Sequence, residues 1–303
     1  MLTGSCWAKI WDKLLALPVN SVKFPSQCVP LHQWLSAWSD ESKPSIAIGL
    51  MNEPNMVDTD DLAAAYKEVV TNMRVNLKLR NRLLVMGNYR GGLHAQVTPE
   101  DRSSASECSG PAATGEGSTK GGKMPIAVVH DAIKDIPNLQ PWTFEAHQYL
   151  DFFSTGNWDC DHGWPANKSS CATGTVDQVK QFVNWDPFMQ YCKDNKISVA
   201  LTEFGGHPTK RCNDWLQGFL QMMQDDAYTE EKGYGVIMWQ LWRVCPHTSW
   251  YAGVNVQNPN ADCVQFAAPQ TADPQEYAAL WRVTSDPSVQ YSMKNGIKQF
   301  VQK

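Results

Sequence analysis

The hydrophobic positions of this chain fall into short apolar runs separated by longer amphipathic stretches. The runs at 45–53, 83–89 and 197–206 are too short for helices and predict buried strands. Between the first two runs, apolar residues from Leu62 to Leu77 recur every three or four positions, with Asp58 where a helix cap is expected. Because strand alternates with helix along most of the chain, we predict a parallel α/β sheet or barrel.

The same pattern of hydrophobic and polar positions predicts the remaining helices and strands. Apolar spacing from Trp7 to Leu15 predicts a helix that ends before Pro18. We also expect strands at 19–24, 142–149 and 234–242, helices at 31–38, 125–136, 176–193 and 215–223, and peripheral helices at 275–282 and 292–302. A break is expected at Pro187 within the fourth of these helices. Residues 98–122, rich in Ser, Gly, Ala and Thr, predict an exposed loop.

Size and charge narrow the classes of function. At 303 residues and 43% hydrophobic content, the chain can form one large domain with a sizeable core. A formal net charge of −5 argues against a nucleic acid as partner. No apolar run reaches the roughly 18 residues of a membrane span, so we expect no membrane partner.

The nine cysteines predict disulfide bonds rather than a metal site. They are scattered, with no CxxC or HExxH pattern, so no zinc site is expected. Cysteines in loops and the sequon at Asn167 indicate an oxidising compartment, and we expect Cys212 to pair with Cys160 or Cys171. Residues 1–25 nevertheless lack a secretory signal. We therefore expect that the true beginning of the protein is not in this sequence.

Two of the predicted strands end in a glutamate. Glu53 precedes Pro54, and Glu203 precedes the glycines 205 and 206. A carboxylate at the carboxyl end of a buried parallel strand stands where α/β barrels place their chemistry, and it is costly to hold there without a use. Two such glutamates predict one active site.

His147 and Tyr149 stand two residues apart in another predicted strand, so both side chains leave the same face. A lone buried His or Tyr is more often a satisfied core residue. Their placement beside two strand-end glutamates favours a functional role instead.

Three motifs stand in a characteristic order: Gly-Leu-Met-Asn-Glu-Pro at 49–54, His-Gln-Tyr-Leu-Asp at 147–151 and Leu-Thr-Glu-Phe-Gly-Gly at 201–206. Together they resemble glycoside hydrolase family five and, within it, the fungal-type endo-β-1,4-glucanases. Asn-Glu-Pro alone would be a weak signal, whereas three strand-end motifs in order are specific. The resemblance covers roughly residues 40–250, and it implies a (β/α)8 TIM barrel that cleaves β-glucan with retention of configuration, without metal or organic cofactor.

The resemblance also implies roles for individual residues. Glu53 would be the acid/base on the fourth strand and Glu203 the nucleophile on the seventh. The substrate-binding residues would be Asn52, which touches the sugar beside the scissile bond, His147 and Tyr149, which flank the reaction centre, and Trp239, the sugar platform on the eighth strand. Retaining hydrolysis needs one ionised and one protonated carboxyl about 5 Å apart, which agrees with two glutamates whose pKa values are pushed apart. Trp242 and Trp250 are further candidates for the sugar cleft.

The chain departs from the family before its first motif. Members carry an Arg on the second strand and a His at the end of the third, and here Lys23 stands in a segment with only a faint likeness to the former motif. The stretch before residue 45 cannot hold three strand–helix units of about 40 residues each. We expect a barrel shortened at its front; a partial barrel with another task is the rival interpretation. A shortened barrel would leave an open sheet edge, so we expect weak activity from residues 1–303 alone.

The resulting hypothesis is an endo-β-1,4-glucanase. Residues 1–253 would form its catalytic domain and residues 254–303 a peripheral helical extension. We expect a secreted, extracellular monomer whose partner is a β-glucan polysaccharide or oligosaccharide. Alternatives are a β-mannanase or β-1,3-glucanase of the same family, and a carbohydrate-binding protein without catalytic activity.

Overall fold

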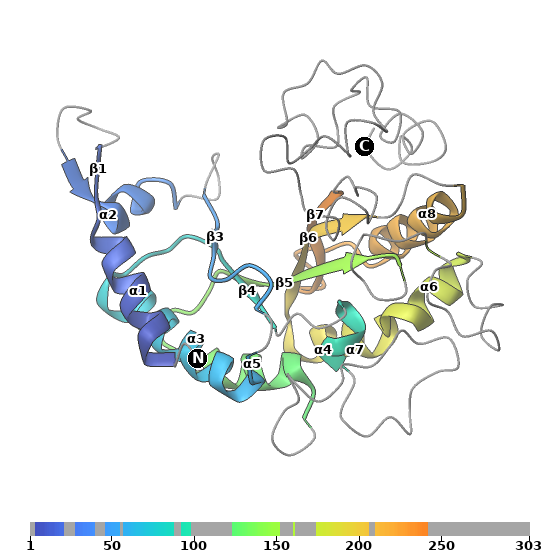
Figure 1. Ribbon diagram of the computed structural model, residues 1–303, viewed down its shortest axis with the longest axis horizontal. Coiled ribbons are helices and arrows are strands. Elements are labelled where there is room, and N and C mark those ends of the chain that lie inside the picture. The colour runs from blue at the N-terminus through green and yellow to red at the C-terminus, as the bar shows by residue number, and fades with distance from the viewer. Residues whose placement is uncertain are drawn as a thin grey trace, which may run out of the picture. The chain divides into compact units, whose positions relative to one another are not determined.

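The computed structural model describes residues 4–20, 28–39, 46–54, 57–87, 92–97, 123–151, 160, 174–205 and 210–241 (Figure 1). Its helices are α1 (Gly4–Ala16), α2 (Leu31–Ser36), α3 (Thr59–Thr71), α4 (Leu93–Val97), α5 (Pro125–Ile133), α6 (Val176–Val183), α7 (Trp185–Asn195) and α8 (Lys210–Asp225), and the π-helix η1 (Asn72–Asn76) continues α3. Its strands are β1 (Pro18–Asn20), β2 (Cys28–Pro30), β3 (Ile48–Gly49), β4 (Leu83–Met86), β5 (Trp142–Tyr149), β6 (Ser198–Gly205) and β7 (Gly235–Leu241).

Five of these strands form one sheet in the order β3-β4-β5-β6-β7, and β1 with β2 makes a separate antiparallel pair. β3 pairs in parallel with β4, β4 with β5, and β6 with β7. The chain order of the strands is also their order in the sheet, as in a sheet built from successive strand–helix units. The predicted alternation of strand and helix is confirmed.

The chain divides into two compact units. The main division falls within β5, between Glu145 and Ala146, and the segment Gly91–Ala95, which includes the start of α4, also belongs to the second unit. In the first unit, α3 packs against α1 and α5. The apolar stripe predicted for α3 forms its buried face, which includes Leu62, Tyr66, Val69 and Val70. The Asp58 side chain caps this helix by accepting from the backbone N–H of Asp60, so the predicted cap is confirmed.

In the second unit, α6 packs against α7 and α8, and α7 also contacts β7. Aromatic side chains fill the space between these elements. Their rings meet in tilted or edge-to-face pairs of Phe182 with Trp215, Trp185 with Phe188 and Phe219, and Phe204 with Phe219 and Trp239. The Trp185 indole donates to the Asp226 carboxylate at 2.7 Å, so its buried N–H is satisfied.

The predicted helix at 176–193 is two helices, and the predicted break at Pro187 is wrong. The break lies at Asn184, whose backbone is left-handed (φ 51°, ψ 45°), a conformation that asparagine adopts more readily than most residues. Pro187 instead lies in the first turn of α7, where a backbone N–H has no partner within the helix and its absence costs little.

Several other predictions fall outside the described residues. These are the loop at 98–122, the two peripheral helices after residue 274, Trp242 and Trp250, and the proposed extension 254–303. The same holds for the side chain of Cys212 and so for its pairing. Cys160 takes part in a disulfide bond, and Cys192 carries a free, buried thiol.

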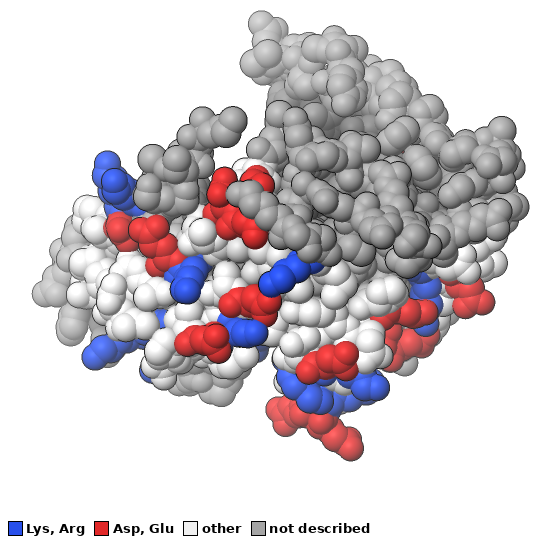
Figure 2. Space-filling model, turned by 90° about the horizontal axis from the view of Figure 1, so that it is seen from below, with Lys and Arg blue, Asp and Glu red and all other residues white. Residues whose placement is uncertain are grey.

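Figure 2 shows acidic and basic side chains interspersed over the described part of one face, as expected for a chain with a small negative net charge. Among the described helices, none combines the length and hydrophobicity of a membrane-spanning segment.

Candidate active site

Glu53 follows β3 in the first unit, at a bend of the chain. The pairing with β4 continues one residue past the strand, because the Leu50 N–H donates to the Leu84 carbonyl at 3.0 Å. The Trp11 indole donates to the Leu50 carbonyl at 3.2 Å and so anchors the same segment to α1. Glu53 itself has φ of 42°, and Asn52 beside it is exposed. A positive φ is uncommon for glutamate and marks a strained position of the kind that clusters at functional sites.

In the second unit, the end of β5 is held by hydrogen bonds on both sides. The Gln148 carbonyl oxygen accepts from the backbone N–H of Leu93 at 2.8 Å, and the Gln148 amide donates to the Tyr149 carbonyl at 2.7 Å. One residue further, the Leu150 N–H donates to the Gly205 carbonyl at 2.9 Å. The last of these bonds keeps the end of β5 beside the end of β6, and the first joins it to the start of α4.

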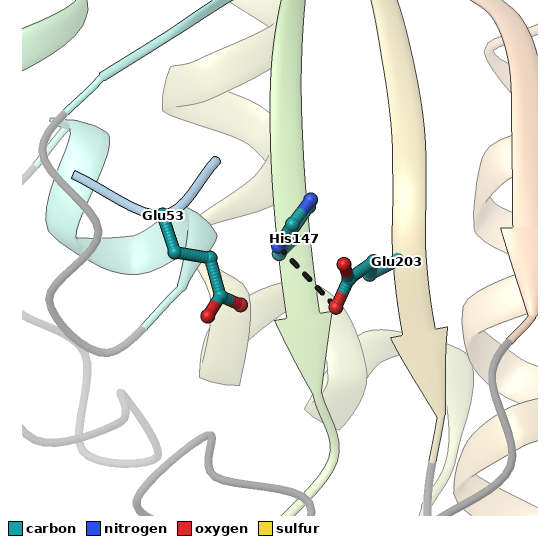
Figure 3. Close-up of side chains that lie close together, drawn as sticks. All are labelled: Glu53, His147 and Glu203. Atoms are coloured by element: carbon teal, nitrogen blue, oxygen red, sulfur yellow. Dashed lines mark ion pairs between the residues drawn. The ribbon is translucent and has the colours of Figure 1, made fainter. Parts of the chain in front are cut away.

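His147, Tyr149 and Glu203 come together at this place. The Tyr149 hydroxyl donates to Glu203 Oε2 at 2.9 Å, and His147 Nδ1 lies 3.6 Å from the same oxygen. Figure 3 shows the contact between His147 on β5 and Glu203 on β6. Because a hydrogen bond donated to a carboxylate favours its ionised form, Tyr149 stabilises Glu203 as an anion.

The two sides of His147 have different partners. Nε2 is 3.1 Å from Thr202 Oγ1, and Nδ1 faces Glu203. The His147 side chain is only 1% exposed, whereas that of Glu203 is 19% exposed. A buried imidazole therefore lies beside a carboxylate that remains accessible to a substrate.

Trp239 lies on β7, next to β6. Its ring meets that of Phe204 edge to face, with centroids 5.7 Å apart. Trp239 is half-buried, and stacking on a sugar would require an accessible face of its ring.

The structure thus joins three of the predicted site residues directly, His147, Tyr149 and Glu203, and places Trp239 on the neighbouring strand. It also shows two contacts that the sequence did not single out, those of Gln148 and Thr202. Both residues lie within the motifs at 147–151 and 201–206. The partners Leu93 of Gln148 and His147 of Thr202 are remote in sequence, so no local pattern could have shown these two contacts.

A parallel α/β sheet with acidic side chains at the ends of its strands is the arrangement found in barrel-type hydrolases. The chain belongs to the cellulase family, glycosyl hydrolase family 5, whose sequence pattern matches residues 31–244. This confirms the resemblance drawn from the three motifs. It also confirms the (β/α)8 barrel as the fold class, to which the parallel strands β3–β7 contribute.

Individual relatives are endoglucanases. Endoglucanase EG-II of Hypocrea jecorina is 25% identical over 210 residues, which cover 67% of this chain and 41% of that protein. Endoglucanase 1 of Robillarda sp. (strain Y-20) is 23% identical over 219 residues, 72% of this chain and 42% of that protein. The chain therefore spans about two fifths of the length of these relatives.

Among solved structures, the chain is similar to the endo-β-1,4-glucanase Xac0029 from Xanthomonas axonopodis pv. citri. The TM-score is 0.48 at 25% identity, and the alignment covers 74% of this chain and 55% of that one.

Proposed function

We propose that this protein hydrolyses β-1,4-glucosidic bonds in cellulose or a related β-glucan, with retention of configuration at the anomeric carbon. Membership of the cellulase family is the observation that carries the proposal. The endoglucanase names of the two relatives agree with it.

In the proposed mechanism, Glu203 is the nucleophile. A carboxylate attacks the anomeric carbon only when it is ionised and oriented, and the hydrogen bond from Tyr149 to Oε2 supports both conditions. The attack forms a covalent glycosyl–enzyme intermediate. Water then hydrolyses this intermediate and returns Glu203 to its ionised form.

Glu53 is the proposed acid/base. In the first step its protonated carboxyl donates to the leaving glycosidic oxygen, and in the second its carboxylate takes the proton of the attacking water. Its position after β3, a parallel strand of the same sheet, supports this role. The positive φ of Glu53 agrees with this role, because strained backbone positions cluster at functional sites.

The remaining proposed residues bind the sugar. Asn52 is exposed and offers an amide to a hydroxyl beside the scissile bond, and the half-buried Trp239 offers its ring to a pyranose. His147 would act on the reaction centre through Glu203. None of these steps requires a metal or an organic cofactor.

Turnover on three polysaccharides tests the substrate. Carboxymethylcellulose, mannan and laminarin are assayed side by side with the same enzyme preparation, and we expect the fastest turnover on carboxymethylcellulose. Fastest turnover on mannan would identify a β-mannanase instead, and fastest turnover on laminarin a β-1,3-glucanase. Sugar binding with turnover at background on all three would favour a binding protein instead.

The nucleophile has its own test. Glu203→Gln should lower kcat by at least about 10³-fold and leave the Kd for cello-oligosaccharides within about threefold, because it removes transition-state stabilisation and little ground-state contact. Glu231→Gln, at an exposed turn, is the matched control and should leave both unchanged. Loss of binding in step with activity would count against the role of Glu203.

Domain organisation, location and assembly also belong to the proposal. Removal of residues 254–303 should leave a folded catalytic domain.

Cellulose is an extracellular polymer, so the proposed substrate places the protein outside the cell. Light scattering coupled to size exclusion would test the proposed monomer.

A further inference from the structure

We infer that Thr202 is a positioning residue for His147: its hydroxyl holds the imidazole in one orientation and one tautomer beside Glu203. The consequence for catalysis rests on the proposed function, whereas the tautomer does not.

The backbone of β6 brings two consecutive side chains to one partner. In a regular strand, successive side chains point to opposite faces, so Thr202 and Glu203 could not both meet His147. β6, however, advances three residues from Leu201 to Phe204 while β7 advances two from Trp239 to Leu241. This irregularity is a bulge, which is rare in parallel pairs and re-aims side chains beside active sites.

The contacts of His147 then select a tautomer. A neutral imidazole has one N–H donor and one nitrogen acceptor. Nδ1 lies 3.6 Å from Glu203 Oε2, and an ionised carboxylate can only accept, so the proton is favoured on Nδ1. Nε2 is left as the acceptor, and Thr202 Oγ1 at 3.1 Å is placed to donate to it.

This arrangement supports Glu203. The Nδ1–H directs its positive end toward Oε2, the oxygen to which Tyr149 also donates. If the Thr202 hydroxyl is removed, the acceptor nitrogen of a side chain that is only 1% exposed loses this hydrogen bond. The preference for the proton on Nδ1 is then weaker, and a larger share of molecules carries it on Nε2, which leaves a lone pair on Nδ1 toward Oε2.

Selective ¹⁵N labelling of histidine tests the tautomer without reference to activity. The signals of His147 are assigned by their loss in His147→Gln. In the wild-type protein at a pH where His147 is neutral, we expect Nδ1 to give the signal of a protonated nitrogen and Nε2 that of an unprotonated one. In Thr202→Val, which keeps the shape of the side chain but lacks the hydroxyl, both shifts should move toward intermediate values.

Steady-state kinetics test whether the orientation of His147 affects catalysis. Thr202→Val should lower kcat on cello-oligosaccharides by about tenfold, the effect of losing one hydrogen bond in the transition state, with KM within about twofold. Thr202→Ser restores the hydroxyl and should keep kcat within about threefold of wild type. Thr71→Val, which removes a hydroxyl that binds its own helix at Lys67, is the control and should change neither parameter.

The outcomes separate this inference from the proposed function. A wild-type spectrum with the proton on Nε2, or a Thr202→Val spectrum identical to wild type, overturns the inference, and the wild-type spectrum decides even if the variant does not fold. Normal kcat in a folded Thr202→Val protein also overturns it. Sugar binding with turnover at background in the wild-type protein counts against the proposed function, and the tautomer of His147 is still measured by its ¹⁵N shifts.

Discussion

At Glu53 the backbone conformation is unusual for the residue. Its φ of 42° places a glutamate in the left-handed region, and the residue that follows is the buried Pro54. L-residues other than Gly, Asn and Asp pay roughly 1 kcal/mol or more for this conformation. Glycine would adopt this conformation without that cost, and the proposed catalytic role of the side chain offers one reason for a glutamate here.

Substitution of Glu53 is expected to depend on the leaving group. Glu53→Gln should lower kcat/KM for natural cello-oligosaccharides by about 10²-fold or more and affect aryl glycosides with activated leaving groups far less, because activated leaving groups depart without protonation. Steady-state kinetics on both substrate classes measure the difference, with the exposed Glu68→Gln on α3 as control. Equal damage to both classes would exclude Glu53 as the acid.

The thiol of Cys192 should be unreactive in the folded protein. Cys192 is fully buried, and burial raises its pKa well above that of an ordinary thiol, so it stays protonated even at mildly alkaline pH. We expect alkylation at pH 8 to leave Cys192 unmodified until denaturant is added. Peptide mapping by mass spectrometry measures the alkylation of Cys192 separately from that of the other cysteines. Rapid alkylation of Cys192 under native conditions would contradict its buried position.

At the scale of elements, the π-helix η1 presents a buried arginine to the segment that leads into β5. Arg74 is 1% exposed and donates to three backbone carbonyls: to Leu139 at 2.9 Å, Leu79 at 2.7 Å and Pro141 at 2.6 Å. These acceptors lie outside regular helices and strands, and the Pro141 carbonyl also accepts from the Leu83 N–H at 3.2 Å. Arg74 therefore joins the end of α3 to the start of β5.

Loss of this guanidinium should destabilise the first unit. Arg74→Met keeps the apolar length of the side chain but leaves three carbonyls without this donor, so we expect the free energy of unfolding to fall by about 3 kcal/mol or more. Urea denaturation measures this loss. Arg80→Met, at an exposed position in the same connection, is the matched control and should change stability by less than about 0.5 kcal/mol. Equal midpoints for both variants would refute the structural role of Arg74.

At the scale of the whole molecule, family membership connects the fold to a stereochemical outcome. Retaining enzymes place their two carboxyls about 5 Å apart, whereas inverting enzymes need room for a water molecule between them. Proton NMR of a cello-oligosaccharide digest should therefore show the β-anomer of the new reducing end first, with the α-anomer appearing only by mutarotation. Initial release of the α-anomer would show that Glu203 does not form a covalent intermediate.

Much of this protein follows from the sequence alone. The residues of β5 coincide with the predicted strand 142–149, and α3 has the predicted cap at Asp58 and the predicted buried stripe. These features depend on local periodicity and on residues close together in the chain, which a sequence displays directly. The strand-end glutamates and the three motifs pointed to the family for the same reason.

The tertiary structure decided the contacts between remote residues. The helix break falls at Asn184, where the backbone is left-handed, and not at Pro187, which the first turn of α7 accommodates. Alternation along β6 predicts opposite faces for Thr202 and Glu203, and the bulge against β7 brings both to His147. The orientation of these side chains depends on hydrogen-bond partners in other elements. The periodicity of the sequence does not show such partners.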